Sequence, residues 1–287
     1  ISKAGHDAYW LSRINMTLKR KTIITTLPGN RKNNFAEEKH VLKKVSVDFE
    51  WKMMANNHLI PADPVVKQVV DRYVSELPAD SNQVIGISQN KLDSSTESVR
   101  TKETTMGNVA ADAMQLATQA DLVYINGGTI RGDRVYEPLH AITKGDIYRE
   151  MPFPTYISRA QMLGRDFLLA MEQALSKVEY KLGCFPHINK NLKIEYDMKK
   201  EPMKRIKQIS VFQPETKIWQ PLDLEKTYVV ASSDYLFSGG DNIEAMKNHV
   251  PMKANNEVQV RLSDLVVEYI IKNKVLKVQK EGRIVQL

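Results

Sequence analysis

The feature of this sequence that most constrains its fold is the stretch from Asp121 to Asp133, which reads D-L-V-Y-I-N-G-G-T-I-R-G-D. Residues 122–126 have the character of a short buried strand, and two glycines follow at once. Glycine carries no Cβ and can adopt positive φ, so we expect the backbone at Gly128 to approach a ligand closely. For this stretch alone, a plain strand and tight turn with Arg131 in solvent is the favoured interpretation. Other segments have to decide between the two.

The composition is that of an ordinary globular protein. The chain has 287 residues, 42% of them apolar and 26% charged, so we expect one large domain or two modest ones. No apolar run comes near the roughly 20 residues that a membrane-spanning helix needs, and no membrane span is expected. The single cysteine, Cys184, excludes an internal disulfide framework and leaves the compartment open. The chain begins at Ile1 rather than Met, and we expect a fragment of a longer protein.

The net charge of +7 raises the question of nucleic-acid binding. The basic residues lie in small scattered groups, such as 19–21, 43–44 and 204–207. No aromatic residues alternate with them, as a surface for single strands would require. We therefore expect no nucleic-acid partner. A mild positive field still favours a small anionic substrate.

Residues 1–60 predict several strands with a polar loop between them. The strands are expected at 8–18, 22–27 and 41–51, and the loop at 28–39. Three strands with nothing to cover a face make a poor domain on their own, so we expect the end of a larger sheet.

Residues 61–80 predict a linker helix. Asp63 can cap the helix and Pro64 suits its first turn. Apolar residues then recur at helical spacing until Pro78 ends the element.

From residue 81 to 287, helix and strand patterns are mixed without regular alternation. This predicts an α+β fold, a mixed sheet packed with helices. A helix is expected from Thr104 or Thr105, and Gly107 in its first turn costs about 1 kcal/mol relative to alanine, which indicates close packing or ligand approach. The other expected helices lie at 141–151, 164–179 and 258–272, and the expected strands at 82–92, 122–126, 155–162, 192–197, 205–212, 227–232 and 283–287, with a polar turn at 93–101.

Five motifs in order carry a resemblance. They read K-E-T-T-M-G-N-V-A-A-D-A from Lys102, I-N-G-G-T-I-R, K-G-D-I-Y-R-E-M-P-F, L-G-C-F-P-H and K-T-Y-V-V-A-S-S-D-Y-L-F-S-G-G-D. In this order they resemble the C-terminal, substrate-binding domain of the 5′-nucleotidase family of secreted metallophosphoesterases. Residues 3–15 are similar to the closing strands of that family's catalytic domain. The resemblance thus implies terminal strands of a truncated metallophosphoesterase domain at 1–60, a linker helix at 61–80 and a nucleotide-binding C-terminal domain at 81–287.

The resemblance also implies roles for individual residues. An aromatic ring on each face of a base stabilises binding by about 1–3 kcal/mol per contact, and every base offers such a face. A carboxylate can accept hydrogen bonds from ribose hydroxyls, and guanidinium groups hold phosphate or carboxylate oxygens. The implied roles are stacking by Phe153 and Tyr235, base-edge contact by Asn126, backbone approach at Gly128, sugar contact by Asp241 and cationic contacts by Arg131 and Lys102.

Four positions depart from the family pattern. Thr129 stands at the usual third glycine, Lys102 at a common arginine, Tyr235 at a more frequent phenylalanine and Asn242 at a usual glycine. Lysine lacks the bidentate geometry of arginine. These departures put the substrate preference in question more than the fold.

Metal-binding motifs are absent from the sequence. The family hydrolyses phosphate esters with two divalent metal ions, but this chain has no D-x-H and no H-x-H, and its six histidines are dispersed. We expect the two metals in a missing N-terminal catalytic domain and predict that this chain alone is inactive.

The leading hypothesis is thus the nucleoside- or nucleotide-recognition half of a dimetal phosphoric ester hydrolase acting in nucleotide catabolism. The alternative is a non-catalytic interaction module on the same fold, whose aromatic residues only fill the core. The resemblance further implies a periplasmic, secreted or cell-surface location, with the catalytic domain as partner, and it allows a homodimer.

Overall fold

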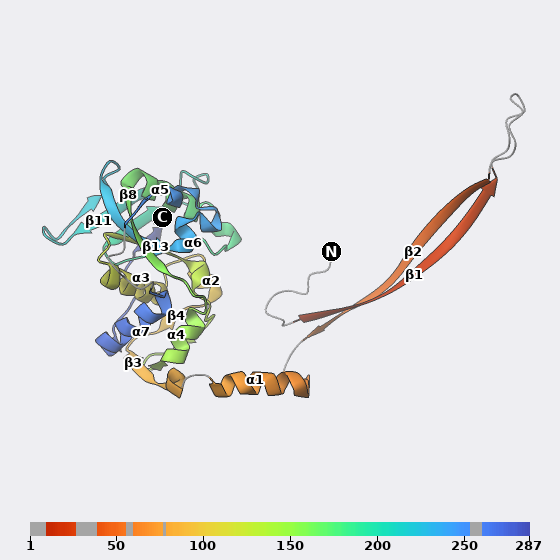
Figure 1. Cartoon of the computed structure of the whole chain (residues 1–287). Coiled ribbons are helices and arrows are strands. Elements are labelled where there is room, and N and C mark those ends of the chain that lie inside the picture. The colour runs from red at the N-terminus through yellow and green to blue at the C-terminus, as the bar shows by residue number, and fades with distance from the viewer. Residues whose placement is uncertain (1–9, 27–38, 56–59, 77–78, 253–259) are drawn as a thin grey trace, which may run out of the picture. The chain divides into compact units, whose positions relative to one another are not determined.

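The computed structural model describes residues 10–26, 39–55, 60–76, 79–252 and 260–287. These residues form two compact units, Ile1–Leu77 and Pro78–Leu287, and Figure 1 shows the elements of each. Among the described residues no helix is long and apolar enough to cross a membrane.

The first unit contains a hairpin of two long strands and one helix. Strand β1 (Trp10–Thr26) pairs antiparallel with β2 (Lys39–Ala55). The prediction of two strands at 8–18 and 22–27 is wrong, because β1 runs unbroken through the basic residues 19–21, whose side chains are exposed. The predicted loop at 28–39 lies outside the described residues except for its last position. Helix α1 (Pro64–Glu76) confirms the predicted helix, and Asp63 Oδ1 caps it by accepting the amide of Val65 at 2.9 Å.

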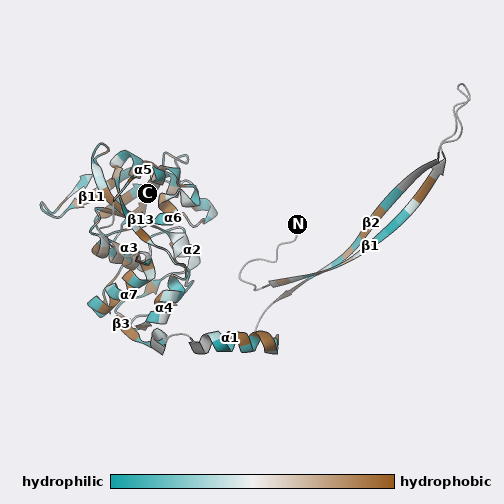
Figure 2. Cartoon of the chain, in the orientation of Figure 1, coloured by the Kyte–Doolittle hydropathy of each residue, from teal (hydrophilic) through white to brown (hydrophobic). Residues whose placement is uncertain are grey.

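The β1–β2 hairpin is amphipathic. Its register pairs Met16 with Phe49 and Leu18 with Val47, so these side chains share one face. All four are exposed, Met16 to 69%. Figure 2 shows apolar and hydrophilic stretches along both strands. A two-stranded hairpin is marginally stable in water by itself, so this apolar face needs a partner.

The second unit is built on a five-stranded mixed sheet of order β14-β8-β13-β5-β9, which confirms the predicted α+β class. Strand β5 (Leu122–Asn126) is buried along its whole length. Leu122 and Tyr124 belong to one apolar core, and Val123 and Ile125 to another. Helix α5 (Gly164–Leu175) contributes to the first core and α3 (Thr105–Thr118) to the second, on opposite sides of β13 (Thr227–Ser233) in Figure 1.

Most predicted elements of this unit are present, with shifted ends. The predicted helix at 141–151 begins with a short strand, and the predicted helix at 164–179 ends at Leu175. Part of the predicted polar turn at 93–101 is a short helix. The remaining helices are α2 (Thr96–Val99), α4 (Lys144–Glu150), α6 (Asp234–Phe237) and α7 (Leu262–Asn273). The remaining strands are β3 (Val84–Ser88), β4 (Leu92–Asp93), β6 (Val135–Tyr136), β7 (Ala141–Thr143), β8 (Ile157–Leu163), β9 (Pro186–Ile188), β10 (Leu192–Tyr196), β11 (Ile206–Gln213), β12 (Ile218–Pro221), β14 (Val250–Pro251), β15 (Val275–Leu276) and β16 (Ile284–Gln286).

Helix α3 begins as the sequence predicts, with the Thr104 hydroxyl accepting the amide of Gly107 at 3.1 Å. Gly107 is needed for packing, because a Cβ there would lie 2.1 Å from Nδ1 of the buried His187 ring. Ring Nε2 of His187 donates to the Val99 carbonyl at 2.9 Å. Of the two explanations that the sequence left open for Gly107, close packing is the one that the structure supports.

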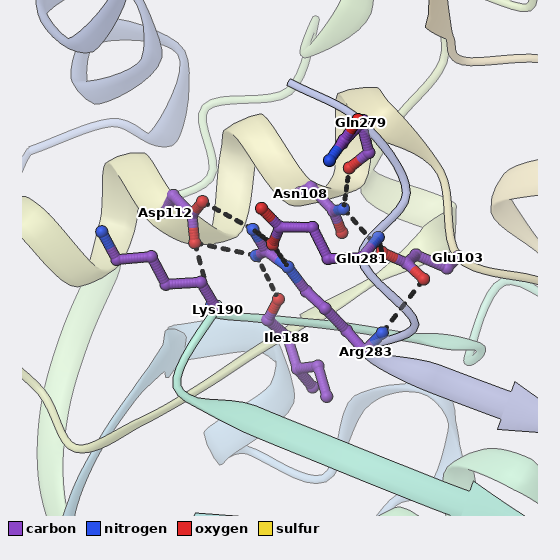
Figure 3. Close-up of polar contacts among 8 residues, drawn as sticks. All are labelled: Glu103, Asn108, Asp112, Ile188, Lys190, Gln279, Glu281 and Arg283. Atoms are coloured by element: carbon purple, nitrogen blue, oxygen red, sulfur yellow. Dashed lines mark hydrogen bonds and ion pairs between the residues drawn. The ribbon is translucent and has the colours of Figure 1, made fainter. Parts of the chain in front are cut away.

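A buried ion cluster fixes the C-terminal segment to α3, as Figure 3 shows. The Arg283 guanidinium donates to both carboxylate oxygens of Asp112, at 2.8 and 2.7 Å, and to Glu281. The carboxylate of Glu103, just before α3, accepts the backbone amides of Glu281 and Arg283 at 2.8 and 3.0 Å. Because every charge in the cluster has several partners, its burial is tolerated.

Replacing Gly107 by alanine should destabilise the protein although alanine favours helices. We expect a loss of about 1–3 kcal/mol in the free energy of unfolding, because the new Cβ overlaps the His187 ring. Urea unfolding followed by circular dichroism measures it. Ala117→Gly, at an exposed position of α3, is the control for helix propensity alone and should cost about 1 kcal/mol. An unchanged or raised stability of Gly107→Ala would contradict the packing argument.

Arg283→Met should cost roughly 3–5 kcal/mol, because it leaves the nearly buried Asp112 carboxylate without its charged partner. The matched control is Arg165→Met, which breaks the exposed pair of Arg165 and Glu225 and should cost less than about 1 kcal/mol. Both values come from the same urea titration. Equal costs for the two variants would show that the buried cluster contributes no more than a surface pair.

Candidate functional site

The parallel pairing of β5 and β13 creates the site. The carboxyl ends of neighbouring parallel strands meet at one edge of a sheet. Residue Leu122 of β5 pairs with Val230 of β13, so the turns that follow the two strands lie side by side. A cavity of about 540 Å³ opens there. Its lining contains six predicted site residues, Asn126, Gly128, Arg131, Phe153, Tyr235 and Asp241.

Asn126 and Asp241 join the two turns at the cavity. The Asn126 amide donates from Nδ2 to Asp241 Oδ2 at 2.8 Å. On its other side, Asn126 Oδ1 accepts the hydroxyl of Thr129 at 2.6 Å. Asn126 is only 4% exposed, so these two bonds fix the orientation of its amide. The Asp241 carboxylate is thereby held in place at the cavity.

Asp241 is held by backbone conformation as well as by hydrogen bonds. Asp241 and Asn242 both have left-handed backbones, with φ of 55° and 62°. Asparagine and aspartate tolerate this conformation better than other residues with a side chain, so Asn242 is compatible with a position at which the sequence resemblance implies glycine. Gly240 has no room for a side chain, since a Cβ would lie 2.4 Å from the Tyr235 ring.

The Tyr235 hydroxyl donates to Asp241 Oδ1 at 2.8 Å and accepts the Asp241 amide at 2.9 Å. Burial, followed by the hydrogen bond to Asp241, raises the pKa of Tyr235. The ring itself remains 52% exposed, and Phe153 across the same cavity lining is 47% exposed. Two half-exposed rings at one cavity are available to a planar ligand, whereas rings that filled a core would be buried.

Gly127 and Gly128 do not use the positive φ that the sequence suggested as the reason for glycine in this turn. Neither Gly127 nor Gly128 is among the described glycines with positive φ. A Cβ on Gly127 would lie 1.9 Å from the Val99 carbonyl oxygen, so close backbone packing demands this glycine. Gly128 donates its amide to the Gly183 carbonyl at 2.7 Å, and a Cβ there would lie 3.2 Å from Gly183 Cα. The glycines therefore bring protein backbones together, and Gly128 also lines the cavity.

Two arginines line the cavity, and one of them was not predicted. Arg131 lies with its guanidinium carbon 5.3 Å from the centre of the Phe153 ring. Arg100 is the second, whereas the predicted Lys102 is exposed and is not part of the lining. Arg100 and Lys102 lie two positions apart at the end of α2 and just after it. Of the two, Arg100 lines the cavity. Among the described contacts, neither arginine has a carboxylate partner, so both are available to an anion.

The described residues do not suit a dimetal centre. No three His, Cys, Asp or Glu side chains gather among them in a way that could hold a metal ion. His187 is buried in packing, and His249 Nδ1 donates to the Met246 carbonyl at 2.8 Å. Burial raises the pKa of the Cys184 thiol, which disfavours the reactive thiolate. No chemical step is assigned to these residues.

The family model described as "5′-nucleotidase, C-terminal domain" matches residues 84–248, more than half of the chain. A mouse 5′-nucleotidase is 27% identical over 240 residues, which are 79% of this chain and 41% of that protein. The trifunctional nucleotide phosphoesterase protein YfkN of Bacillus subtilis (strain 168) is 31% identical over 221 residues, 70% of this chain and 14% of that protein.

Among solved structures, a 5′-nucleotidase precursor from Thermus thermophilus is similar with a TM-score of 0.71 and 26% sequence identity. The match covers 86% of this chain and 47% of that chain. The chain thus spans less than half of the length of each of these three relatives.

Acid should destabilise the protein through His187, whose ring supports Val99 behind the Gly127 turn. Burial lowers its pKa from 6.5 to about 4. The unfolded chain therefore binds a proton that the folded chain excludes, so stability is present above pH 6.5 and is lost as the pH falls toward 4. Between about pH 7 and 5 we expect a loss of about 2 kcal/mol from this group.

Urea unfolding of the wild type and of His187→Gln at about pH 7, 6 and 5 tests this expectation. The wild type should lose more stability than the variant across this range. Equal pH slopes for the two proteins would assign the acid sensitivity to other groups.

Proposed function

Because the chain belongs to the 5′-nucleotidase family through its C-terminal domain, we propose that its cavity recognises the nucleoside part of a nucleotide or related phosphate ester. The recognition serves a dimetal phosphoester hydrolase whose catalytic residues lie in another part of a longer protein. The observation that carries the proposal is the chemistry gathered at one cavity: two half-exposed rings, an anchored carboxylate and two arginines without carboxylate partners among the described contacts.

Each group matches one part of a nucleotide. Phe153 and Tyr235 offer faces on which a base stacks, and such stacking tolerates different bases. Asp241 is an acceptor for ribose hydroxyls, and its two oxygens are already oriented by Asn126 and Tyr235. Arg100 and Arg131 offer donors to phosphate oxygens. A nucleotide therefore satisfies the aromatic, acceptor and donor groups of the cavity together.

Hydrolysis is assigned to a different part of the protein. In this family two metal ions orient the phosphate and supply the nucleophile. We assign binding and orientation of the substrate to this chain, because no group of metal ligands gathers among the residues that the structure describes. Orientation of a bound substrate lowers a reaction barrier considerably, because it removes the entropy cost of bringing groups together.

We assign the β1–β2 hairpin to the end of the catalytic domain, α1 to the linker and residues 81–287 to the recognition domain. The exposed apolar face of the hairpin supports this assignment, because another layer of a larger domain would cover it. A relative from snake venom supports a secreted or cell-surface setting for the whole protein. A periplasmic location and a homodimer remain further elements of this proposal.

The alternative of an interaction module whose aromatic residues fill the core is less favoured, because Phe153 and Tyr235 are half-exposed. Nucleic-acid binding is also less favoured, since the basic residues lie in small scattered groups without aromatic residues alternating between them. Failure of the affinity for single-stranded DNA to fall with salt would remove that alternative.

Isothermal titration of the 287-residue chain with AMP and adenosine tests the proposal. We expect the wild type to bind both and the variant with Phe153→Ala and Tyr235→Ala to bind at least about tenfold more weakly, because each stacking contact contributes about 1–3 kcal/mol. Tyr180→Ala removes an exposed aromatic ring outside the cavity and should leave the affinity unchanged. No binding by the wild type, or equal binding by the double variant, would refute the recognition role.

A further inference from the structure

A buried carboxyl group lies behind the cavity wall, and the proposed function does not use it. Glu150 ends α4 and is 0% exposed. It is not part of the cavity lining, and sequence reasoning gave it no role. Burying a carboxyl group is costly unless hydrogen bonds compensate, so its presence here needs an explanation.

The hydrogen bonds of Glu150 converge on one oxygen. Ser94 Oγ and the Tyr136 hydroxyl lie 2.9 and 2.7 Å from Oε1. Ser94 follows β4 and Tyr136 belongs to β6, which pair as a two-stranded ribbon. The other oxygen, Oε2, has no hydrogen-bond partner among the described residues. Burial is the largest influence on this carboxyl group and raises the pKa of Glu150.

Glu150 contacts the turn that carries Arg131 at two consecutive residues. Its backbone carbonyl accepts the amide of Arg131 at 2.7 Å. Its carboxyl group packs on Gly132 so closely that a Cβ there would lie 1.9 Å from Oε1. The turn thus packs directly against the carboxyl group, which the ribbon holds by two hydrogen bonds.

Glu150 also stands directly before the segment that carries Phe153. Met151 is buried and donates its amide to the Ile147 carbonyl at 2.9 Å, so the chain leaves α4 in one direction. Phe153 follows three residues after Glu150, and its ring meets the Arg131 guanidinium at 5.3 Å. Glu150 thus contacts the turn that carries Arg131 and lies three residues before Phe153.

We infer that Glu150 is a positioning residue for nucleotide binding, which holds the Arg131 guanidinium over the Phe153 ring where it can meet an anionic ligand oxygen. The inference rests on the proposed function of the cavity. It assigns a binding role to a group that does not touch the ligand. A carboxyl group kept only for stability would show no energetic coupling to Arg131 in ligand binding.

A double-mutant cycle on the full chain tests the coupling, with AMP as the probe and isothermal titration as the measurement. Glu150→Ala and Arg131→Ala should each weaken AMP binding by about tenfold. The protein with both changes should bind no more weakly than Arg131→Ala alone, because Glu150 acts through that guanidinium. Glu150→Gln keeps an acceptor at Oε1 and should restore part of the affinity.

Ile270→Val is the matched control, because it trims a fully buried side chain of α7 away from the cavity. It should lower the unfolding midpoint and leave AMP affinity within about twofold of the wild type. If Glu150→Ala does not fold, Tyr136→Phe removes one hydrogen bond to Oε1 and should weaken AMP binding by about threefold, again only when Arg131 is present.

The outcomes separate the two proposals. A wild type that does not bind AMP overturns the proposed function and this inference with it. A wild type that binds AMP, together with Glu150 variants that change only the unfolding midpoint, overturns this inference alone. Losses from Glu150→Ala and Arg131→Ala that multiply in the double variant also overturn it.

Discussion

The burial of β5 on both faces is the constraint on which the second unit depends. Alternate side chains of this strand enter two different apolar cores, one with α5 and one with α3. Both cores therefore depend on side chains of this one strand. Since β5 also pairs in parallel with β13, the same strand fixes where the sheet edge lies and which two turns meet there. The position of the cavity is therefore a consequence of core packing.

In the turn that follows β5, close backbone packing replaces conformational freedom as the reason for glycine. Gly127 lies against the Val99 carbonyl, and Gly128 against Gly183. These contacts bring the end of α2 and the loop around residue 183 to the cavity, and Arg100 comes with them. The wall of the cavity is thus assembled from distant parts of the sequence, held by contacts that exclude side chains.

Sequence patterns predicted the elements whose signals are local. The apolar run before two glycines predicted the bounds of β5, and a capping threonine with periodic apolar residues predicted the start of α3. The break predicted within β1 was wrong because an exposed strand accepts basic residues on both faces, Lys19 and Lys21 on one and Arg20 on the other. The order of the motifs predicted six residues that line the cavity. Local sequence could not distinguish Arg100 from Lys102, because both are basic and only the fold shows which of them lines the cavity. Glu150 had no local signal, because Ser94 lies 56 positions from it.

The buried pairing of Arg283 with Asp112 has a consequence for how the protein is made. The two residues are 171 positions apart, so α3 leaves the ribosome long before its charged partner has been synthesised. During that interval the carboxylates of Asp112 and Glu103 stay exposed to water. The second core is also incomplete, because α7 has not yet been synthesised. Long-range contacts of this kind slow folding and delay the final state. A nascent chain of this domain would therefore depend on protection from aggregation until nearly all of it has emerged.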